Sequence, residues 1–529
     1  MNKQYSFLKI IMPGIILMAL IGISCKKYIY QAPITSTYDA EFWTSQTSVN
    51  QAALAMYGQL RADLNDINTS SGVASFFVNG DLCAGTFLPN STQWNYMAFT
   101  ANNDIYTSSG PFFFSYAPYL EDLQNWSRFY ELIAQANLIL ENVPPMSSSL
   151  FTNNSTKNAF LGEALFMRAY TYFYMIRIWG DPVYVTKTYD GADYGNIPPL
   201  ARTPEATVLD SCIADLKVAA GYLSFTGGNP TLAIRANAGS VYALMADIYA
   251  WQHDYTDAHT ACQRVINNGG YSLEPMATYT NIWKGESSAE SIFELPMQYN
   301  PNDPNFTSQN SWAEAQFGFF GTFLKGPIVD NQNSNCWVSP SGGFVDQFFD
   351  TANDARYHAI LTPIPASNGD GSGYMLLKYT NFSFQQPGIT PGTGTLPYIN
   401  NNLVLYRLSD IYLLDAEALA YTGDIEGARA DLAKTENRAG ITSYLTPTNQ
   451  YDMIDEVVTE RGRELIGEGQ WYYDLIRTEP TQGWLEYVGY QAGGRVNATN
   501  KGYYWPLDMA TLFPQDNLLT QNPWWAAHK

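Results

Sequence analysis

The stretch VYALMADIYAWQHDYTDAHTACQRVINNGGY, residues 241–271, contains two amphipathic segments of helical period separated by a short polar turn. Asp254 and Tyr255 stand at the turn. Small residues recur where two antiparallel helices would touch, with Ala246 in the first segment and Ala258 in the second. Apolar residues at such intervals are typical of helices that bury one face. The stretch therefore predicts a helical hairpin.

A second stretch of the same kind lies far along the chain. It reads YLLDAEALAYTGDIEGARADLAKTENRAG, residues 412–440, with Gly423 and Asp424 at the turn and Ala428 on the second helix. The spacing of small and aromatic residues in both stretches resembles a tetratricopeptide hairpin. Each such hairpin needs neighbouring helices to bury its apolar face. We therefore expect a mainly α fold, a scaffold of tetratricopeptide-like helical hairpins with insertions between them.

Three earlier stretches complete the expected scaffold. Helical periodicity runs over residues 42–60, 126–144 and 160–184, and the last of these ends at a Gly-Asp-Pro sequence that begins at Gly180. We expect these helices to pack beside the two hairpins.

Long irregular stretches separate the helical ones. Residues 65–125, 277–350 and 361–402 are rich in Asn, Ser, Gly, Pro and aromatic residues. Loops of this length inside a compact domain are usually functional. We expect these insertions to form the ligand surface above the helical scaffold.

The composition narrows the choice of ligand. The 529 residues carry a formal charge of −21, which repels nucleic acid and anionic lipid headgroups. Aromatic residues make up 15% of the chain, enough to supply rings to the surface as well as to the core. A neutral ligand such as a sugar is compatible with both features.

Metal and nucleophile chemistry have little support. The five cysteines form no C-x-x-C motif, and the four histidines form no H-E-x-x-H motif. The Asp/Asn-rich segment 300–306 has no ordered spacing of calcium ligands. His253 and His259 flank the first hairpin turn, and we expect them to be solvated. We expect no metal and no cofactor.

The N-terminus has the pattern of a secretion signal. Lys3 and Lys9 precede an apolar run, residues 10–23, that is too short for a comfortable membrane span. The run is followed by the small residue Ser24 and then by Cys25, an arrangement that resembles a bacterial lipoprotein signal. We expect residues 1–24 to be removed and Cys25 to carry lipid, which anchors a protein without spanning the membrane. The alternative is an ordinary signal peptide with an incidental cysteine.

The segment ERGRELIGEGQWYYDLIR, residues 460–477, is the most enzyme-like in the chain. Glycoside hydrolysis uses two carboxylates about 5 Å apart for retention, and Glu464 and Glu468 are at that spacing if they share a helix. Two carboxylates on one helix face point the same way, however, and neighbouring arginines lower their pKa values, the wrong direction for a general acid.

We therefore predict a structural ion-pair helix at this segment. The expected i, i+3 pairs are Glu460–Arg463, Arg461–Glu464 and Asp474–Arg477, with Glu468 on the same helix. Trp471, Tyr472 and Leu475 are expected to hold the helix in the scaffold.

Several stretches together resemble one family, the SusD/RagB family of surface glycan-binding lipoproteins. They are YDAEFWTSQTSVNQAALAMYGQLR (38–61), WSRFYELIAQANLILENV (126–143), GEALFMRAYTYFYMIRIWGDPV (162–183), RTPEATVLDSCIADLKVAAGYL (202–223), LYRLSDIYLLDAEALAYTG (405–423), the charged segment above and YWPLDMATLFPQDNLLTQNPWW (504–525). The resemblance implies one SusD-like domain over residues 25–529, with an N-terminal part over about 25–230 and a C-terminal part over about 280–529.

The resemblance also implies a function. Proteins of this family are lipid-anchored at the cell surface in the outer membrane, catalyse no reaction, and pass an oligosaccharide or polysaccharide to a SusC-like TonB-dependent transporter. Two alternatives remain: a tetratricopeptide scaffold that grips a protein or peptide, and a glycoside hydrolase. The sequence does not name the glycan.

Aromatic residues in the insertions are the candidates for glycan contact. A flat ring offers apolar area to the C–H face of a pyranose at a small entropic cost. Trp94 is the first candidate, because it lies among polar residues in the insertion where SusD-like proteins commonly place a stacking aromatic. The other candidates are Tyr96, Trp312, Trp337, Trp283 and Phe320, with Asn95, Asn102 and Asn103 as partners for sugar hydroxyls. For each ring, the alternative is burial in loop packing.

Overall fold

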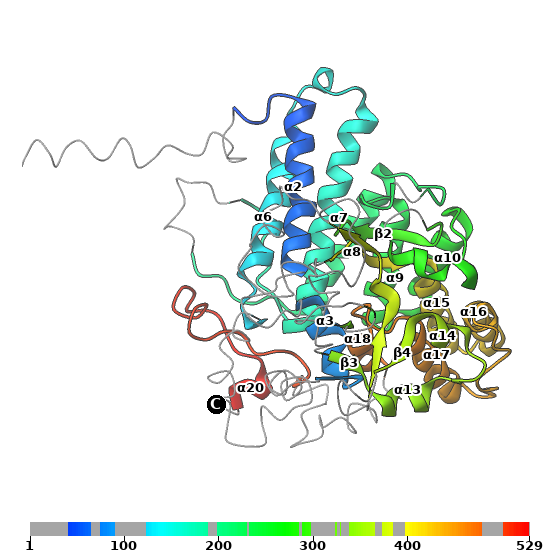
Figure 1. Ribbon diagram of the computed structural model, residues 1–529. Coiled ribbons are helices and arrows are strands. Elements are labelled where there is room, and N and C mark those ends of the chain that lie inside the picture. The colour runs from blue at the N-terminus through cyan, green and yellow to red at the C-terminus, as the bar shows by residue number, and fades with distance from the viewer. Residues whose placement is uncertain are drawn as a thin grey trace, which may run out of the picture.

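The computed structural model is dominated by helices that pack around a continuous core (Figure 1). It describes residues 41–64, 75–89, 123–188, 198–229, 232–284, 288–297, 323–324, 328, 338–364, 373–384, 397–478 and 501–527. Within these ranges no helix is both long enough and apolar enough to cross a membrane. The signal segment and Cys25 lie outside the described residues.

Four long helices build the N-terminal part of the scaffold, and three of them stand side by side in Figure 1. They are α2 (Gln46–Leu64), α6 (Ser127–Asn142), α7 (Asn154–Trp179) and α8 (Glu205–Tyr222). The Asn153 side chain begins α7 by accepting a bond from the amide of Thr156, and Gly180 ends it with φ +74°. The three helices expected before residue 184 are confirmed.

Both predicted hairpins are present. The first consists of α9 (Ala238–Trp251) and α10 (Tyr255–Asn268), and the second of α15 (Leu408–Thr422) and α16 (Ile425–Arg438). Asp254 and Asp424 cap the second helix of each pair, and Gly423 takes the left-handed conformation at its turn. Ala246 and Ala258 are fully buried. Helix α15 packs against α10, so the two hairpins stack although some 140 residues separate them in sequence.

The charged segment 460–477 is not one helix. Helix α17 (Gln450–Glu464) ends at Glu464, a turn follows, and α18 (Trp471–Arg477) begins at Trp471. Gly467 and Gly469 have positive φ in this turn, a conformation that stops the first helix. The prediction of a single helix was wrong because it did not count these glycines as a break.

The expected irregular insertions contain short secondary structure. Four two-stranded antiparallel ladders pair β1 (Phe87–Pro89) with β3 (Val338–Pro340), β2 (Ser291–Leu295) with β8 (Leu403–Arg407), β4 (Leu361–Pro363) with β5 (Tyr374–Leu376), and β6 (Phe382–Phe384) with β7 (Pro397–Ile399). The short helices are α3 (Ser75–Gly80), α13 (Gly342–Phe348), α14 (Ala355–Ile360), α20 (Pro523–Ala527) and the 3-10 turns at Leu82–Ala84, Ser148–Leu150, Met276–Trp283 and Leu377–Tyr379.

Two of these ladders join strands more than 100 residues apart, and such pairs leave no local sequence pattern. The core beneath them is rich in aromatic rings. Trp471, Tyr472 and Leu475 are buried in it, as predicted. Cys83, Cys212 and Cys262 are buried, so they act as small packing residues.

Candidate functional site

Glu464, at the end of α17, is the centre of a buried charged cluster. Its carboxylate accepts bonds from Arg407 Nη1 at 2.6 Å, Arg356 Nη1 at 3.0 Å and the Tyr279 hydroxyl at 2.9 Å, and it also pairs with Arg438. The Glu464 side chain has no exposed surface. Burial opposes its ionisation, but the three guanidinium groups outweigh burial and hold the pKa of Glu464 well below its ordinary value.

Glu468 belongs to the same cluster. Arg407 bridges the two carboxylates, with Nε 2.8 Å from Glu468 Oε2, and Lys378 Nζ lies 2.6 Å from Glu468 Oε1. Burial opposes ionisation here too, yet these cations lower the pKa of Glu468. Burial also lowers the pKa of Lys378 to about 8. Neither carboxylate can donate a proton near neutral pH or reach a substrate, so this pair is not an acid/base centre.

Two of the three predicted ion pairs in the segment are confirmed. Arg463 Nη1 lies 2.8 Å from Glu460 Oε2, and Arg477 Nη2 lies 2.8 Å from Asp474 Oδ1. All four side chains are buried. Ion pairs in such surroundings depend on mutual compensation, because each isolated charge would be costly.

The third predicted pair, Arg461–Glu464, is wrong. Arg461 binds Asp410 Oδ1 and Asp474 Oδ2, both at 2.8 Å. Glu464 instead faces arginines supplied by α14, β8 and α16. These partners come from distant parts of the chain, and nothing in the local sequence indicated them.

A second cluster of titratable groups lies between α10, α15 and α16. His259 Nδ1 is 2.6 Å from Asp415 Oδ1, and Gln263 Nε2 donates to Asp415 Oδ2 at 2.6 Å. Burial raises the pKa of Asp415 to about 6, and burial together with neighbouring Asp415 raises the pKa of Asp431 to about 7. Because its ring contacts Asp415, His259 is only partly exposed to solvent, and the expectation that it is solvated was wrong. In the described part of the chain, no group of three or more His, Cys, Asp or Glu has the geometry of a metal site.

The prediction that Trp283 contacts the glycan was wrong. Its ring is fully buried, 5.2 Å from the ring of Tyr279, with Lys378 Nζ 4.6 Å from its centroid and Arg407 beyond. The ring therefore covers the charged cluster and offers no face to a ligand. The remaining candidates lie outside the described residues: Trp94, Tyr96, Trp312, Trp337, Phe320, Asn95, Asn102 and Asn103.

The described strands nevertheless show where two candidate stretches join the structure. In the β1–β3 ladder, Pro89 pairs with Val338. The chain leaves β1 after Pro89 towards Trp94, and it enters β3 at Val338 directly after Trp337. Because the ladder is antiparallel, both stretches are attached at the same end of it. The fold thus brings together the attachment points of two insertions, Pro89 and Val338, which lie more than 200 residues apart in the chain.

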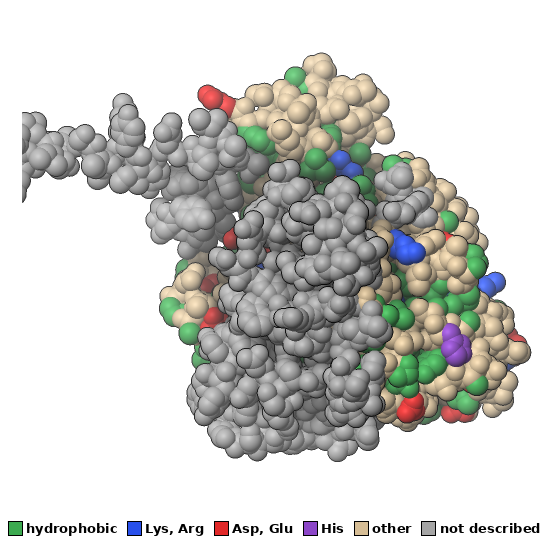
Figure 2. Space-filling model, viewed as in Figure 1, with side chains coloured by type: hydrophobic (Ala, Val, Ile, Leu, Met, Phe, Trp, Pro, Cys, Tyr) green, Lys and Arg blue, Asp and Glu red, His purple; other side chains and the backbone are tan. Residues whose placement is uncertain are grey.

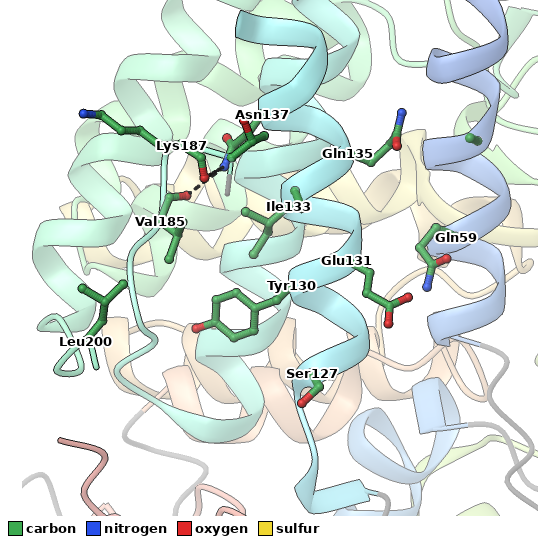
Figure 3. Close-up of a pocket in the computed structure, with 13 residues that line it drawn as sticks. Gln59, Ser127, Tyr130, Glu131, Ile133, Gln135, Asn137, Val185, Lys187 and Leu200 are labelled. Atoms are coloured by element: carbon green, nitrogen blue, oxygen red, sulfur yellow. Dashed lines mark hydrogen bonds between the residues drawn. The ribbon is translucent and has the colours of Figure 1, made fainter. Parts of the chain in front are cut away.

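A groove of about 570 Å³ lies on the N-terminal helices (Figure 3). Its floor is α6, and its walls are α2 and, on the other side, residues 185–188 together with Leu200. On one side of α6, Glu131 and Gln135 extend toward α2, which carries Gln59 (Figure 3). Its apolar contacts include Ala55, Ile133, Ala134, Val185 and Leu200.

On the other side of α6, hydrogen bonds fasten the groove wall. Asn137 Nδ2 donates to the carbonyl of Val185 at 3.2 Å, and the Tyr130 hydroxyl donates to the carbonyl of Val183 at 2.9 Å. These side chains serve the fold. The amides and carboxylate on the α2 side are the part of the groove that a ligand could use.

Comparisons with known proteins agree with the architecture. A family model described as "SusD family" matches residues 343–525, and a second, described as "Starch-binding associating with outer membrane", matches residues 71–250. The chain belongs to the SusD/RagB family. The resemblance read from the sequence, and the helical SusD-like fold expected with it, are therefore confirmed.

Relatives of this SusD/RagB chain match it over nearly its full length. SusD-like protein P38 of Formosa agariphila is 22% identical over 99% of both chains. A SusD homologue from Bacteroides thetaiotaomicron, solved as a crystal structure, is 26% identical with a TM-score of 0.72 over 92% of this chain and 99% of its own. A solved "Laminarin binding SusD-like protein" is 22% identical with a TM-score of 0.66 over 91% and 99% of the two chains.

Proposed function

We propose that this protein is a cell-surface glycan-binding lipoprotein that delivers a neutral oligosaccharide or polysaccharide to a SusC-like TonB-dependent outer-membrane transporter. Membership of the SusD/RagB family is the observation that carries this proposal, and one family model is described by starch binding and outer-membrane association. A structural neighbour is named for laminarin, a glycan. The net charge of −21 also favours a neutral ligand over an anionic one.

Capture of the glycan is assigned to the aromatic insertions. Trp94 and Trp337 belong to stretches attached at one end of the β1–β3 ladder, so rings from both can serve one surface. Stacking a pyranose on an indole needs neither a cofactor nor a change of ionisation. Asn95, Asn102 and Asn103 are the proposed partners for the sugar hydroxyls. Cys25 supplies the lipid anchor.

The alternatives make different demands. A hydrolase requires an accessible carboxylate with a suitable pKa, and the Glu464–Glu468 pair offers neither access nor that pKa. A peptide-binding scaffold would use the groove on α6, where side-chain amides and a carboxylate line one wall.

Affinity electrophoresis and calorimetry on the mature chain would test the proposal against laminarin, starch, xylan and pectin. We expect binding to at least one neutral glycan, with no release of reducing sugar. We expect Trp94→Ala to lower the affinity by about fivefold, because a lost stacking contact is worth roughly 1 kcal/mol, without lowering the melting temperature.

Gln59→Ala, in the groove on α6, is the matched control and should bind glycan as the wild type does. Absence of binding to every glycan, together with capture of peptides that Gln59→Ala abolishes, would replace the proposal by the peptide-binding alternative. Release of reducing sugar would indicate a hydrolase. Copurification of the transporter from detergent-solubilised outer membrane tests the partner separately.

A further inference from the structure

Two tyrosines form a half-exposed aromatic corner on described elements of the C-terminal part. Tyr357 lies in α14 and Tyr374 begins β5, and both side chains are partly exposed. Their ring centroids are 5.9 Å apart with the planes at 73°, so the rings form two sides of an angle. His358, which is exposed, lies with its ring 5.1 Å from that of Tyr357. Such a corner leaves apolar ring surface beside polar groups.

A carboxylate completes the corner. The Tyr374 hydroxyl donates to Asp346 Oδ1 at 3.1 Å, and Asp346 lies on α13 with its side chain exposed. Burial, followed by the hydrogen bonds to Tyr357 and Asp346, raises the pKa of Tyr374, so the phenol stays protonated and fixed as a donor. Asp346 Oδ2 is then free of that bond and can accept one from a ligand hydroxyl.

The corner is tied to the strands that carry the predicted contacts. Ser341, directly after β3, forms a bridge with Gly373, directly before Tyr374. Val338 at the other end of β3 follows Trp337 in the chain. Three residues of strand separate the two ends, which is about 10 Å at roughly 3.3 Å per residue. Figure 2 shows hydrophobic side chains, a histidine and acidic side chains gathered on the visible face over α13 and α14.

We propose that Tyr357, Tyr374 and Asp346 form a contact site for one neutral pyranose unit of a longer glycan, about one short strand away from the attachment of Trp337. This inference rests on the proposed function and extends it. The pyranose stacks on a tyrosine face, and one of its hydroxyls donates to Asp346. The site favours longer glycans, because a longer chain can contact the corner and the aromatic insertions at the same time.

The chemistry of the corner favours a neutral sugar over other ligands. A uronic acid or a sulfated sugar would place its negative charge beside Asp346 in a chain whose net charge is already −21. An apolar ligand would leave the carboxylate and the phenol without compensation. A neutral sugar satisfies both the rings and the acceptor.

Calorimetric titration of the mature chain with laminarihexaose, laminaritriose, maltohexaose and maltotriose tests the inference. In Asp346→Ala and Tyr357→Ala we expect the affinity for the bound hexasaccharide to fall about threefold to tenfold, the range for one lost hydrogen bond or stacking contact. The affinity for the matching trisaccharide should fall less than that for the hexasaccharide. Tyr374→Phe removes only the hydroxyl and should give a smaller loss of the same kind.

Tyr451→Ala and Glu426→Ala are the matched controls, since both side chains are exposed on other helices. Melting temperatures identify any variant that loses affinity through misfolding, and Asp346→Ala is the informative variant because its side chain is exposed. Equal hexasaccharide affinity in Asp346→Ala, Tyr357→Ala and wild type would overturn the inference while leaving the proposed function intact. Wild-type protein that binds neither hexasaccharides nor the four polysaccharides would overturn both.

Discussion

The protein contains two carboxylate clusters in which the same chemistry has opposite consequences. Around Glu464, three arginines outweigh burial and lower the pKa, so the charged form is the stable one. Around Asp415 and Asp431, no arginine of the described ranges is in salt-bridge contact, and burial raises the two pKa values to about 6 and 7. The number of cations that the fold delivers, rather than burial itself, decides whether a buried acid is ionised.

The clusters also differ in what they join. The Glu464 cluster connects α17 to α14, α16 and β8, and through Lys378 to the turn after β5. It therefore fastens the insertions to the scaffold. The Asp415 cluster lies where the two hairpins stack. Substitutions in the first should lower stability by a large amount, and substitutions in the second should alter mainly its dependence on pH.

The largest loss of folding stability is expected for Glu464→Gln. The change leaves Arg356, Arg407 and Arg438 facing a neutral side chain in a fully buried site, and breaking a buried pair in this way costs about 3–5 kcal/mol. Urea unfolding followed by circular dichroism measures the loss. Glu426→Gln, which breaks the exposed pair with Arg429, is the control and should change little. Equal stability of the two variants would show that the Glu464 cluster does not hold the fold.

Arg463→Ala should come next. Arg463 pairs with Glu460 and Glu456, donates to the carbonyl of Phe348 and lies 3.6 Å over the Tyr444 ring. Its removal should cost about 3 kcal/mol, since two buried carboxylates lose a partner. Glycan affinity per folded molecule should not change, which calorimetry below the unfolding transition would check. Lost affinity with unchanged stability would contradict the structural role.

Tyr279→Phe should have a smaller effect on the same cluster. The Tyr279 hydroxyl donates to Glu464 Oε1 at 2.9 Å, and its loss removes one hydrogen bond to a charged group, worth about 1.5–3 kcal/mol. The three arginines remain, so Glu464 keeps its compensation. Thermal unfolding should show a fall in melting temperature that is smaller than that of Glu464→Gln. A larger fall would mean that the phenol, and not the guanidinium groups, is the main partner.

The smallest expected effect is a change in how the stability of the folded protein depends on pH. The pKa values of Asp415 and Asp431 are raised above 3.8, so the folded state holds these protons more tightly than the unfolded state. The stability that these two groups contribute to the folded state is fully present below pH 3.8, and it is lost as the pH rises through about 6 to 7. Glu464 has the opposite effect because its pKa is lowered in the folded state. The stability that it contributes is present above pH 4.5 and is lost as the pH falls.

Asn resembles a protonated Asp, so Asp431→Asn should lose less stability than wild type between pH 5 and pH 8. After allowance for the solvent exposure of Asp431, the difference should be about 1 kcal/mol. Urea unfolding at both pH values measures it, with Asp257→Asn on the exposed face of α10 as the control. An unchanged pH dependence in Asp431→Asn would show that the pair does not titrate in this range.

Local sequence patterns were sufficient to predict the helical scaffold, but they were insufficient to predict which residues form the candidate sites. The turns at Asp254 and Gly423 were readable because capping and positive φ act within a few residues. The burial of Trp283 could not be predicted from the local sequence, since it depends on contacts with Lys378 and Arg407 from elsewhere in the chain. A tryptophan in a polar insertion has the same local pattern whether its ring covers a cluster or faces a ligand.

The Tyr357–Tyr374–Asp346 corner shows the same limit. Its members come from α14, β5 and α13, and none of them stands out in the sequence. The only signal available was the place of Asp346 and Tyr374 in aromatic-rich insertions, and Tyr357 lies between those two insertions. Their proximity came from the bridge between Ser341 and Gly373, which are 32 positions apart in the chain.

The sequence alone determined the family, the helical hairpins and the ion-pairing character of the segment 460–477, because periodicity, capping and charge spacing are encoded within one or two helical turns. Tertiary structure alone decided which arginines face Glu464, that Trp283 is buried, and that the strands leading to Trp94 and Trp337 share one end of a ladder. Those outcomes depend on contacts between segments up to 250 residues apart, where desolvation and pairing are settled only when the chain has folded.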